Sequence, residues 1–192
     1  MIISHDNKFI CLDPPKTGTN YRQNLLWNYG QYISGLQHAN LIEVKNFFQG
    51  RNLEDYFVFT FVRNPWRRYL SWFNFLHRDS SKNKTPPEEF HRFMHFYLSQ
   101  NFQESKARIS LPQSFWFEHN NEINVDFIGS LENITQDMES ILDKININAE
   151  LKTKAENQSQ YKLNFCDAYN QELIDLVAKK ESKVIKLKGY TV

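Results

Sequence analysis

Short apolar runs alternate with amphipathic segments along this chain, and this order is typical of an α/β protein. The apolar runs at residues 8–12, 56–62 and 125–128 are the expected strands. Residues 56–62, YFVFTFV, carry no charge and are rich in aromatic and β-branched side chains, as in strands buried on both faces. Because strands alternate with helices, the pattern predicts an α/β fold with a parallel β-sheet flanked by helices.

The expected helices are segments in which apolar residues recur at helical spacing. Pro65 lies at the first turn of the third of them, where a helix does not need the missing N–H. The polar segment 78–89, RDSSKNKTPPEE, predicts a surface loop. The helices are expected at residues 20–29, 42–48, 66–76, 88–102, 131–145 and 167–187.

Length and composition narrow the class of protein. A chain of 192 residues predicts one domain spanning residues 1–192, and its net charge of +1 argues against a general nucleic-acid-binding protein. The two cysteines, Cys11 and Cys166, are too few for a disulfide framework and lack the CxxC spacing of a zinc site, so we expect a reducing compartment. Cys11 lies inside an expected apolar strand, so we expect it to be a buried free thiol. No run reaches the about 20 apolar residues that span a bilayer, and the first ten residues do not resemble a signal peptide. We therefore expect a soluble, cytoplasmic protein.

The first candidate for chemistry is residues 15–19, PKTGT, between an expected strand and an expected helix. The N–H groups at a helix N-terminus attract anions, and Gly18 lets the main chain approach a ligand closely. Lys16 adds a positive charge, and Thr17 and Thr19 add hydroxyl groups. The segment therefore predicts a phosphate-binding loop, although an ordinary strand–helix turn with a capping threonine has the same short pattern.

This loop differs from a Walker A motif, in which the lysine follows the second glycine, because Lys16 precedes Gly18. Nucleotide kinases of that class also carry an aspartate on a second strand, where this chain has Arg63. The guanidinium of Arg63 can bind two oxygens of a terminal phosphate, and the Ser71 hydroxyl, eight residues later, can add a donor. Arg67 and Arg68 lie nearby, so a solvated basic helix start is the competing interpretation. Two cationic turns predict a nucleotide with two separate anionic ends.

The two motifs in this order, PKTGT at 15–19 and FVRNPWRRYLSWF at 61–73, resemble those of the cytosolic and Golgi sulfotransferases. Within that family the chain most resembles the carbohydrate sulfotransferase branch. Three further stretches share the likeness: QHAN at 37–40, FIGSLE at 127–132 and KGY at 188–190.

The resemblance implies a P-loop-like nucleotide-binding fold and 3′-phosphoadenosine 5′-phosphosulfate (PAPS) as the donor of the sulfuryl group. It implies that Arg63 and Ser71 bind the 3′-phosphate and that the first loop holds the 5′-phosphosulfate. In this branch it also implies a saccharide hydroxyl as the acceptor, and no metal. Asn20 departs from the family, which more often has serine there. The residues of the first loop are Pro15, Lys16, Thr17, Gly18, Thr19 and Asn20.

Two catalytic roles follow from this resemblance. Lys16 neutralises the charge that grows on the leaving 5′-phosphate. His38 acts as the general base for the acceptor hydroxyl, because imidazole titrates near neutrality, while Glu43 is the second candidate. The role of Gln113, in a loop before the third strand, stays open, and so do the acceptor's identity and the oligomeric state, because specificity lies in loops.

Three other functions compete with sulfuryl transfer. A nucleotide kinase of the P-loop-like class would depend on magnesium. A noncatalytic nucleotide-binding module would keep its biological role after substitution of Lys16 and His38. Single-stranded nucleic-acid binding through residues 61–78 is the least favoured, because the net charge is near zero.

Overall fold

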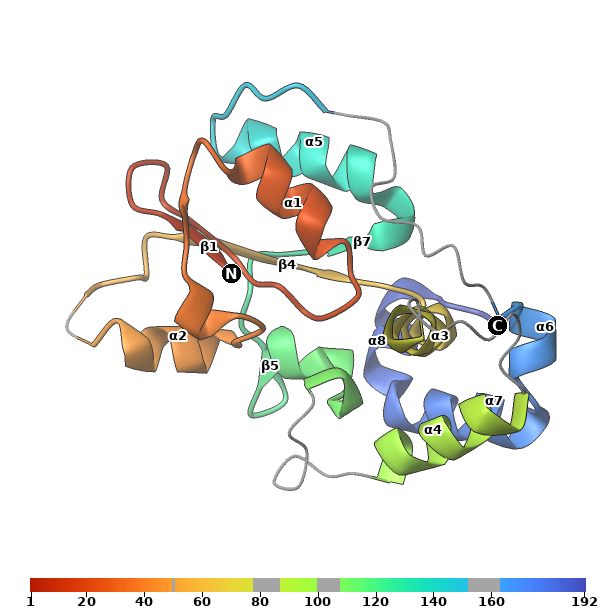
Figure 1. Ribbon diagram of the computed structural model, residues 1–192. Coiled ribbons are helices and arrows are strands. Elements are labelled where there is room, and N and C mark those ends of the chain that lie inside the picture. The colour runs from red at the N-terminus through yellow and green to blue at the C-terminus, as the bar shows by residue number, and fades with distance from the viewer. Residues whose placement is uncertain (50, 78–86, 100–107, 152–162) are drawn as a thin grey trace. The chain divides into compact units, whose positions relative to one another are not determined.

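The computed structural model describes residues 1–49, 51–77, 87–99, 108–151 and 163–192 (Figure 1). Two compact units each combine two stretches of chain. Unit 1 consists of Met1–Val62 and Gln113–Glu156, and unit 2 consists of Arg63–Pro112 and Asn157–Val192. The single domain expected from the chain length stays a prediction.

Unit 1 is built on a five-stranded sheet with the order β3-β1-β2-β4-β7. Strands β2, β4 and β7 are parallel, whereas β1 is antiparallel to both of its neighbours, β2 and β3. A sheet flanked by helices is confirmed, but the wholly parallel sheet is wrong, because β1 pairs antiparallel with β2 and with β3. The short connection over residues 5–8 allows β1 and β2 to pair only in this way. The strands are β1 (Ile2–Ser4), β2 (Phe9–Cys11), β3 (Gln31–Tyr32), β4 (Phe57–Val62) and β7 (Phe127–Ser130), and a separate two-stranded sheet pairs β5 (Glu118–His119) with β6 (Glu122–Ile123).

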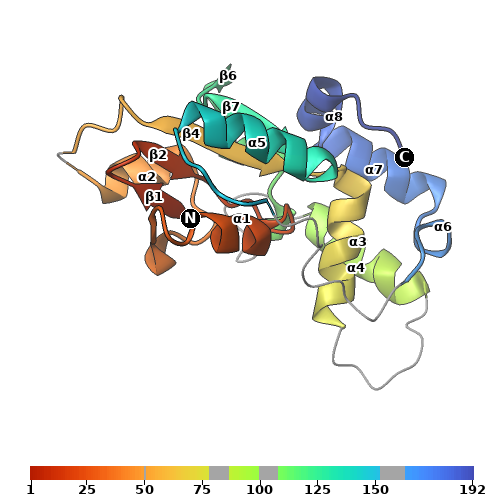
Figure 2. The same cartoon turned by 90° about the horizontal axis from the view of Figure 1, so that it is seen from above.

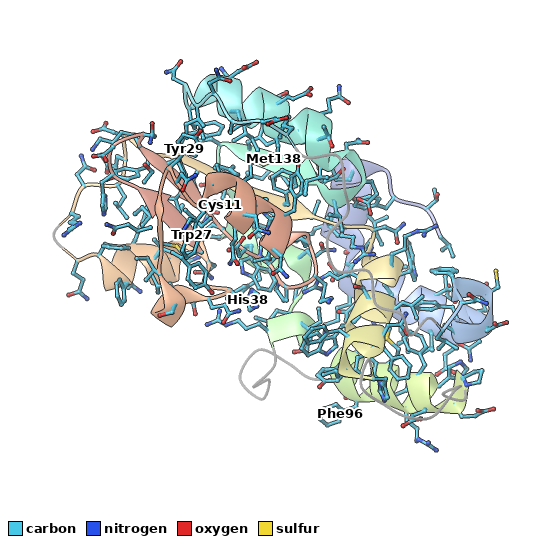
Figure 3. The ribbon with its side chains drawn as sticks, turned by 45° about the horizontal axis from the view of Figure 1, so that its top comes forward. Cys11, Trp27, Tyr29, His38, Phe96 and Met138 are labelled. Atoms are coloured by element: carbon cyan, nitrogen blue, oxygen red, sulfur yellow. The ribbon has the colours of Figure 1, made fainter. Side chains whose placement is uncertain are left out.

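Helices cover both faces of the large sheet, with α1 (Thr19–Leu26) and α5 (Ile134–Lys144) on one face and α2 (Leu41–Phe47) on the other (Figures 1 and 2). Side chains of a strand alternate between the faces, so each strand contributes to two cores. Phe9 and Cys11 of β2 pack with Met138 of α5, while Ile10 packs with Val44 of α2 (Cys11 and Met138 are labelled in Figure 3). Among its described residues, unit 1 also has the 3₁₀ turns η1 (Ser34–Leu36), η3 (Gln113–Trp116) and η4 (Leu131–Asn133).

Cys11 lies in the core of unit 1 and is a free thiol, as predicted. Burial raises the pKa of this thiol from its ordinary value of 9.0 to about 12, and the nearby Asp13 carboxylate adds to the shift. Cys166 is also free but exposed. The two thiols therefore differ in access to reagents.

Unit 2 is helical, and its core is rich in aromatic side chains, among them Tyr69, Phe73 and Phe90. The helices in its described part are α3 (Pro65–Leu76), α4 (Pro87–Ser99), α6 (Phe165–Ala168), α7 (Gln171–Lys180) and α8 (Ser182–Lys188), with the 3₁₀ turn η2 (Arg108–Ser110). None of the helices in the described ranges is both long and apolar enough to cross a membrane.

Two expectations for unit 2 change in the structure. The single helix expected over residues 167–187 is wrong, because α6, α7 and α8 are separate. Asn170, between α6 and α7, caps the start of α7. Glu181 lies between α7 and α8, and its side chain is buried. Residues 87–89 begin α4 instead of ending a loop, while 78–86 and 100–102 lie outside the described residues.

Candidate active site

The PKTGT loop joins the carboxyl end of β2 to the start of α1. Lys16 and Gly18 both have left-handed main-chain conformations, with φ of 68° and 83°. A Cβ atom at Gly18 would lie 2.7 Å from Leu131 Cδ1 and 3.0 Å from Ile134 Cδ1. Only glycine therefore lets the loop keep this turn while packed against the start of α5.

Helix α1 begins without a side-chain cap within the described part of the chain, because its N-cap residue is Gly18. Helices α2, α3 and α7 instead begin at Asn40, Asn64 and Asn170, whose side chains each accept a hydrogen bond from a main-chain N–H of the first turn. The first N–H groups of a helix have no partner within the helix. The start of α1 therefore presents main-chain donors, together with the positive end of the helix dipole, beside Lys16.

The two threonine hydroxyls of the loop have internal partners. The Thr17 hydroxyl donates to the carbonyl of Pro14 at 2.8 Å, and the Thr19 hydroxyl donates to the same carbonyl at 3.4 Å. Thr17 is buried, whereas Lys16 is partly exposed. In this structure the two hydroxyls therefore hold the shape of the loop.

Arg22 of α1 is fully buried and bonds to the middle of the loop and to Asp13, which precedes the loop. Its Nη1 donates to the carbonyl of Thr17, and its Nη2 donates to Asp13 Oδ1 at 3.0 Å. The guanidinium also lies 4.7 Å from the centre of the Phe61 ring. Gly129 leaves space for this ring, because a Cβ there would lie 2.5 Å from it. Sequence reasoning missed both Asp13 and Arg22, although a charged residue inside the amphipathic pattern of α1 was an available signal.

His38 lies on the segment that leads into α2 (labelled in Figure 3) and has a left-handed φ of 60°. Its Nδ1 lies 2.5 Å from the main-chain oxygen of Asp13, and Trp116 Nε1 donates to the His38 carbonyl at 3.0 Å. A carbonyl can only accept, so Nδ1 carries the hydrogen of this bond. The predicted base therefore contacts the residue that leads into the PKTGT loop, within unit 1.

Glu43, the second candidate for the base, forms a capping box with Asn40. Its carboxylate accepts from the Asn40 N–H at 2.8 Å, while Asn40 Oδ1 accepts from the Glu43 N–H at 2.9 Å. These bonds satisfy donors at the start of α2, immediately after His38. The carboxylate of Glu43 is thus used to hold the helix.

Arg63 and Ser71 belong to unit 2, with Arg63 just before the Asn64 cap of α3 and Ser71 in the middle of that helix. Arg67, which is exposed, lies four residues before Ser71 and so on the same helix face. Arg68 is buried, and its Nη1 donates to Glu181 Oε1 at 2.9 Å. Arg68 is therefore a structural residue and not part of a basic helix start.

Comparison with known proteins decides the family. A family model described as the sulfotransferase family matches residues 1–187. This chain belongs to the sulfotransferase family. The match confirms the resemblance seen in the two motifs and supports a transferase acting on a small-molecule donor and a hydroxyl acceptor.

A protein of Archaeoglobus fulgidus, described as uncharacterized, is 31% identical to this sulfotransferase-family chain over 106 residues. The similar region covers 55% of this chain and 81% of the archaeal protein. No solved structure matches the chain with significance. The family match, together with the geometry of the loop and of His38, therefore carries the functional argument.

Proposed function

We propose that this protein transfers a sulfuryl group from PAPS to a hydroxyl group of a carbohydrate. The observation that carries the proposal is the start of α1, where Gly18 provides no side-chain cap and Lys16 stands beside the main-chain donors. A terminal phosphosulfate matches such a group of donors in charge and size. We propose that the loop works in the manner of a P-loop, although its lysine precedes its glycine.

The donor nucleotide has two anionic ends, and we assign one motif to each. Residues 15–20 hold the 5′-phosphosulfate, and Arg63 with Ser71 holds the 3′-phosphate. Arg63 follows Val62, the last residue of β4, and β4 is the parallel neighbour of β2, which leads into the first loop.

The proposed reaction needs a base for the acceptor hydroxyl and a positive charge beside the leaving phosphate. His38 takes the proton of the acceptor hydroxyl as the oxygen attacks sulfur, which forms the new S–O bond. The bond between sulfur and the bridging oxygen of the 5′-phosphate breaks, and Lys16 neutralises the charge on the leaving phosphate. The products are the sulfated acceptor, 3′-phosphoadenosine 5′-phosphate (PAP) and a proton on His38.

His38 is preferred over Glu43 for two reasons. His38 contacts the main chain of Asp13, next to the donor loop, whereas the Glu43 carboxylate already accepts the N–H of Asn40. A change of Glu43 to glutamine keeps an acceptor oxygen for the capping box and removes the basicity. We expect this variant to retain most of the sulfuryl transfer.

Ligand-induced stabilisation tests the donor. PAP should raise the melting temperature far more than AMP or ATP does, because only PAP carries the 3′-phosphate that Arg63 and Ser71 are assigned to bind. A ligand at 100 times its dissociation constant adds about 2.7 kcal/mol to the free energy of unfolding. Equal shifts with AMP and PAP would refute the second phosphate site.

A transfer assay with PAPS and a panel of saccharides, with and without magnesium, then tests the reaction. Sulfated product formed in the presence of a chelator supports the proposal. Transfer of phosphate from ATP with an absolute need for magnesium would instead identify a nucleotide kinase.

A further inference from the structure

We infer that Trp116 is a positioning residue that holds His38 with its Nε2 as the proton-accepting atom. The catalytic consequence rests on the proposed function, in which His38 is the base. The geometric part, which concerns the orientation and the tautomer of the ring, does not depend on any substrate.

The first observation is the main chain at His38. Its φ of 60° lies in the left-handed region, which is uncommon for a residue other than glycine and persists where the surroundings impose it. The segment is fixed on both sides, because the Ala39 N–H donates to the Leu36 carbonyl at 3.1 Å and the capping box of Asn40 begins α2. His38 is thus held between two short elements.

The second observation is the indole of Trp116, which is 1% exposed and belongs to η3. Its Nε1 is only a donor, and the carbonyl of His38 at 3.0 Å is only an acceptor. This bond fixes the direction of the His38 peptide group. The direction of this carbonyl is set by ψ of His38, so the bond restrains the main chain at the Cα atom that carries the imidazole.

The third observation concerns the ring itself. Nδ1 donates to the carbonyl of Asp13, so the neutral imidazole carries its hydrogen on Nδ1 and its basic lone pair on Nε2. The carboxylate of Asp13 pairs with Arg22, which also holds Thr17 of the donor loop. Asp13 therefore connects the orientation of the base to the loop that is assigned to the donor.

The test compares two tryptophan substitutions. Trp116→Phe removes the donor to His38 and keeps an aromatic ring. Trp66→Phe is the matched control, because Trp66 is 3% exposed and its Nε1 donates to the main-chain carbonyl of Ile174 at 3.1 Å in unit 2. Both variants lose one buried hydrogen bond from an indole to a carbonyl, but only one of them loses it at His38.

The substrate-independent measurement is long-range ¹H–¹⁵N NMR of the imidazole nitrogens in the full chain, with the His38 signals assigned by His38→Asn. In the wild type at pH above the titration of the ring, we expect a hydrogen on Nδ1 and none on Nε2. Trp116→Phe should show a mixture of the two tautomers, whereas Trp66→Phe should keep the wild-type signals. A wild-type ring with its hydrogen on Nε2 would overturn the inference, even if Trp116→Phe did not fold.

The second measurement is kinetic and uses PAPS with an acceptor saccharide. Trp116→Phe should lower kcat about tenfold or more, because small displacements of a catalytic group are costly, and should leave the dissociation constant for PAP unchanged. Trp66→Phe should change neither value. If Trp116→Phe turns over at the wild-type rate, Trp116 has no positioning role. If the wild-type protein neither binds PAP nor transfers sulfate, the proposed function fails, while the NMR result still decides the tautomer.

Discussion

Substitution of Arg22 by methionine should strongly destabilise the protein, because the change leaves the Asp13 carboxylate in the core without its main partner. Both side chains are 0% exposed, and their Nη2–Oδ1 distance is 3.0 Å. Removing one member of a buried ion pair costs about 3–5 kcal/mol of unfolding free energy. The bond to the Thr17 carbonyl is lost as well, so we expect the upper part of this range.

A double-mutant cycle separates the pair from the other contacts of Arg22. Asp13→Asn removes the charge but keeps the main-chain carbonyl that His38 contacts. The double variant should be more stable than the sum of the two single changes implies, by about 1–3 kcal/mol, because the Asp13 carboxylate and the Arg22 guanidinium no longer leave each other unpaired. The ammonium of Met1, 3.5 Å from Asp13 Oδ2, loses its partner in Asp13→Asn and in the double variant alike, so this loss cancels in the cycle. Arg67→Met is the control, since Arg67 is exposed and surface substitutions stay within about 0.5 kcal/mol.

Urea unfolding, followed by tryptophan fluorescence and by circular dichroism, provides these free energies. Coincident transitions from the two probes would justify a two-state fit, and an unchanged m-value would show that the extent of unfolding is the same. Additive effects of Asp13→Asn and Arg22→Met would refute the coupling. Loss of less than about 1 kcal/mol in Arg22→Met would refute the assignment of Arg22 as the fastening residue of the loop.

Four further predictions concern the donor and the thiols. Lys16→Ala should lower kcat more than it weakens PAP binding, because the charge that Lys16 neutralises grows in the transition state. Calorimetry measures the affinity for PAP, and a transfer assay measures kcat. A weaker affinity with normal kcat would assign Lys16 to binding alone. Arg63→Ala should weaken PAP binding by about 1.5–3 kcal/mol without abolishing turnover at saturating donor, and an unchanged dissociation constant would remove Arg63 from the site. Iodoacetamide at pH 8 should modify exposed Cys166 and spare Cys11 until the protein unfolds, as mass spectrometry can test. The pKa of Cys11 is raised to about 12 in the fold, so its contribution to stability is present below pH 9 and is lost as the pH rises toward 12. Cys11→Ala should therefore lose less stability at alkaline pH than the wild type does. An identical dependence of stability on pH in the two proteins would contradict this.

The sequence alone determined the elements and motifs that depend on neighbouring residues. The apolar run of β4 and the periodicity of α3 showed these elements within a residue or two, and the two motifs indicated the family that the comparison confirmed. These signals are local, because strand and helix periods and a loop between a strand and a helix are written in fewer than about twenty consecutive residues.

Only the tertiary structure decided which charged and polar residues support the candidate site. Trp116 contacts His38 across 78 positions of the chain, and Arg68 pairs with Glu181 across 113. Adjacent arginines of α3 thereby differ in role, with Arg68 buried and Arg67 exposed, and nothing in their local sequence separates them. The division of the expected C-terminal helix has the same origin, because its apolar pattern continues past Glu181, whose carboxylate is buried against Arg68. Contacts at such separations depend on how the elements pack, and a local pattern contains no information on packing partners.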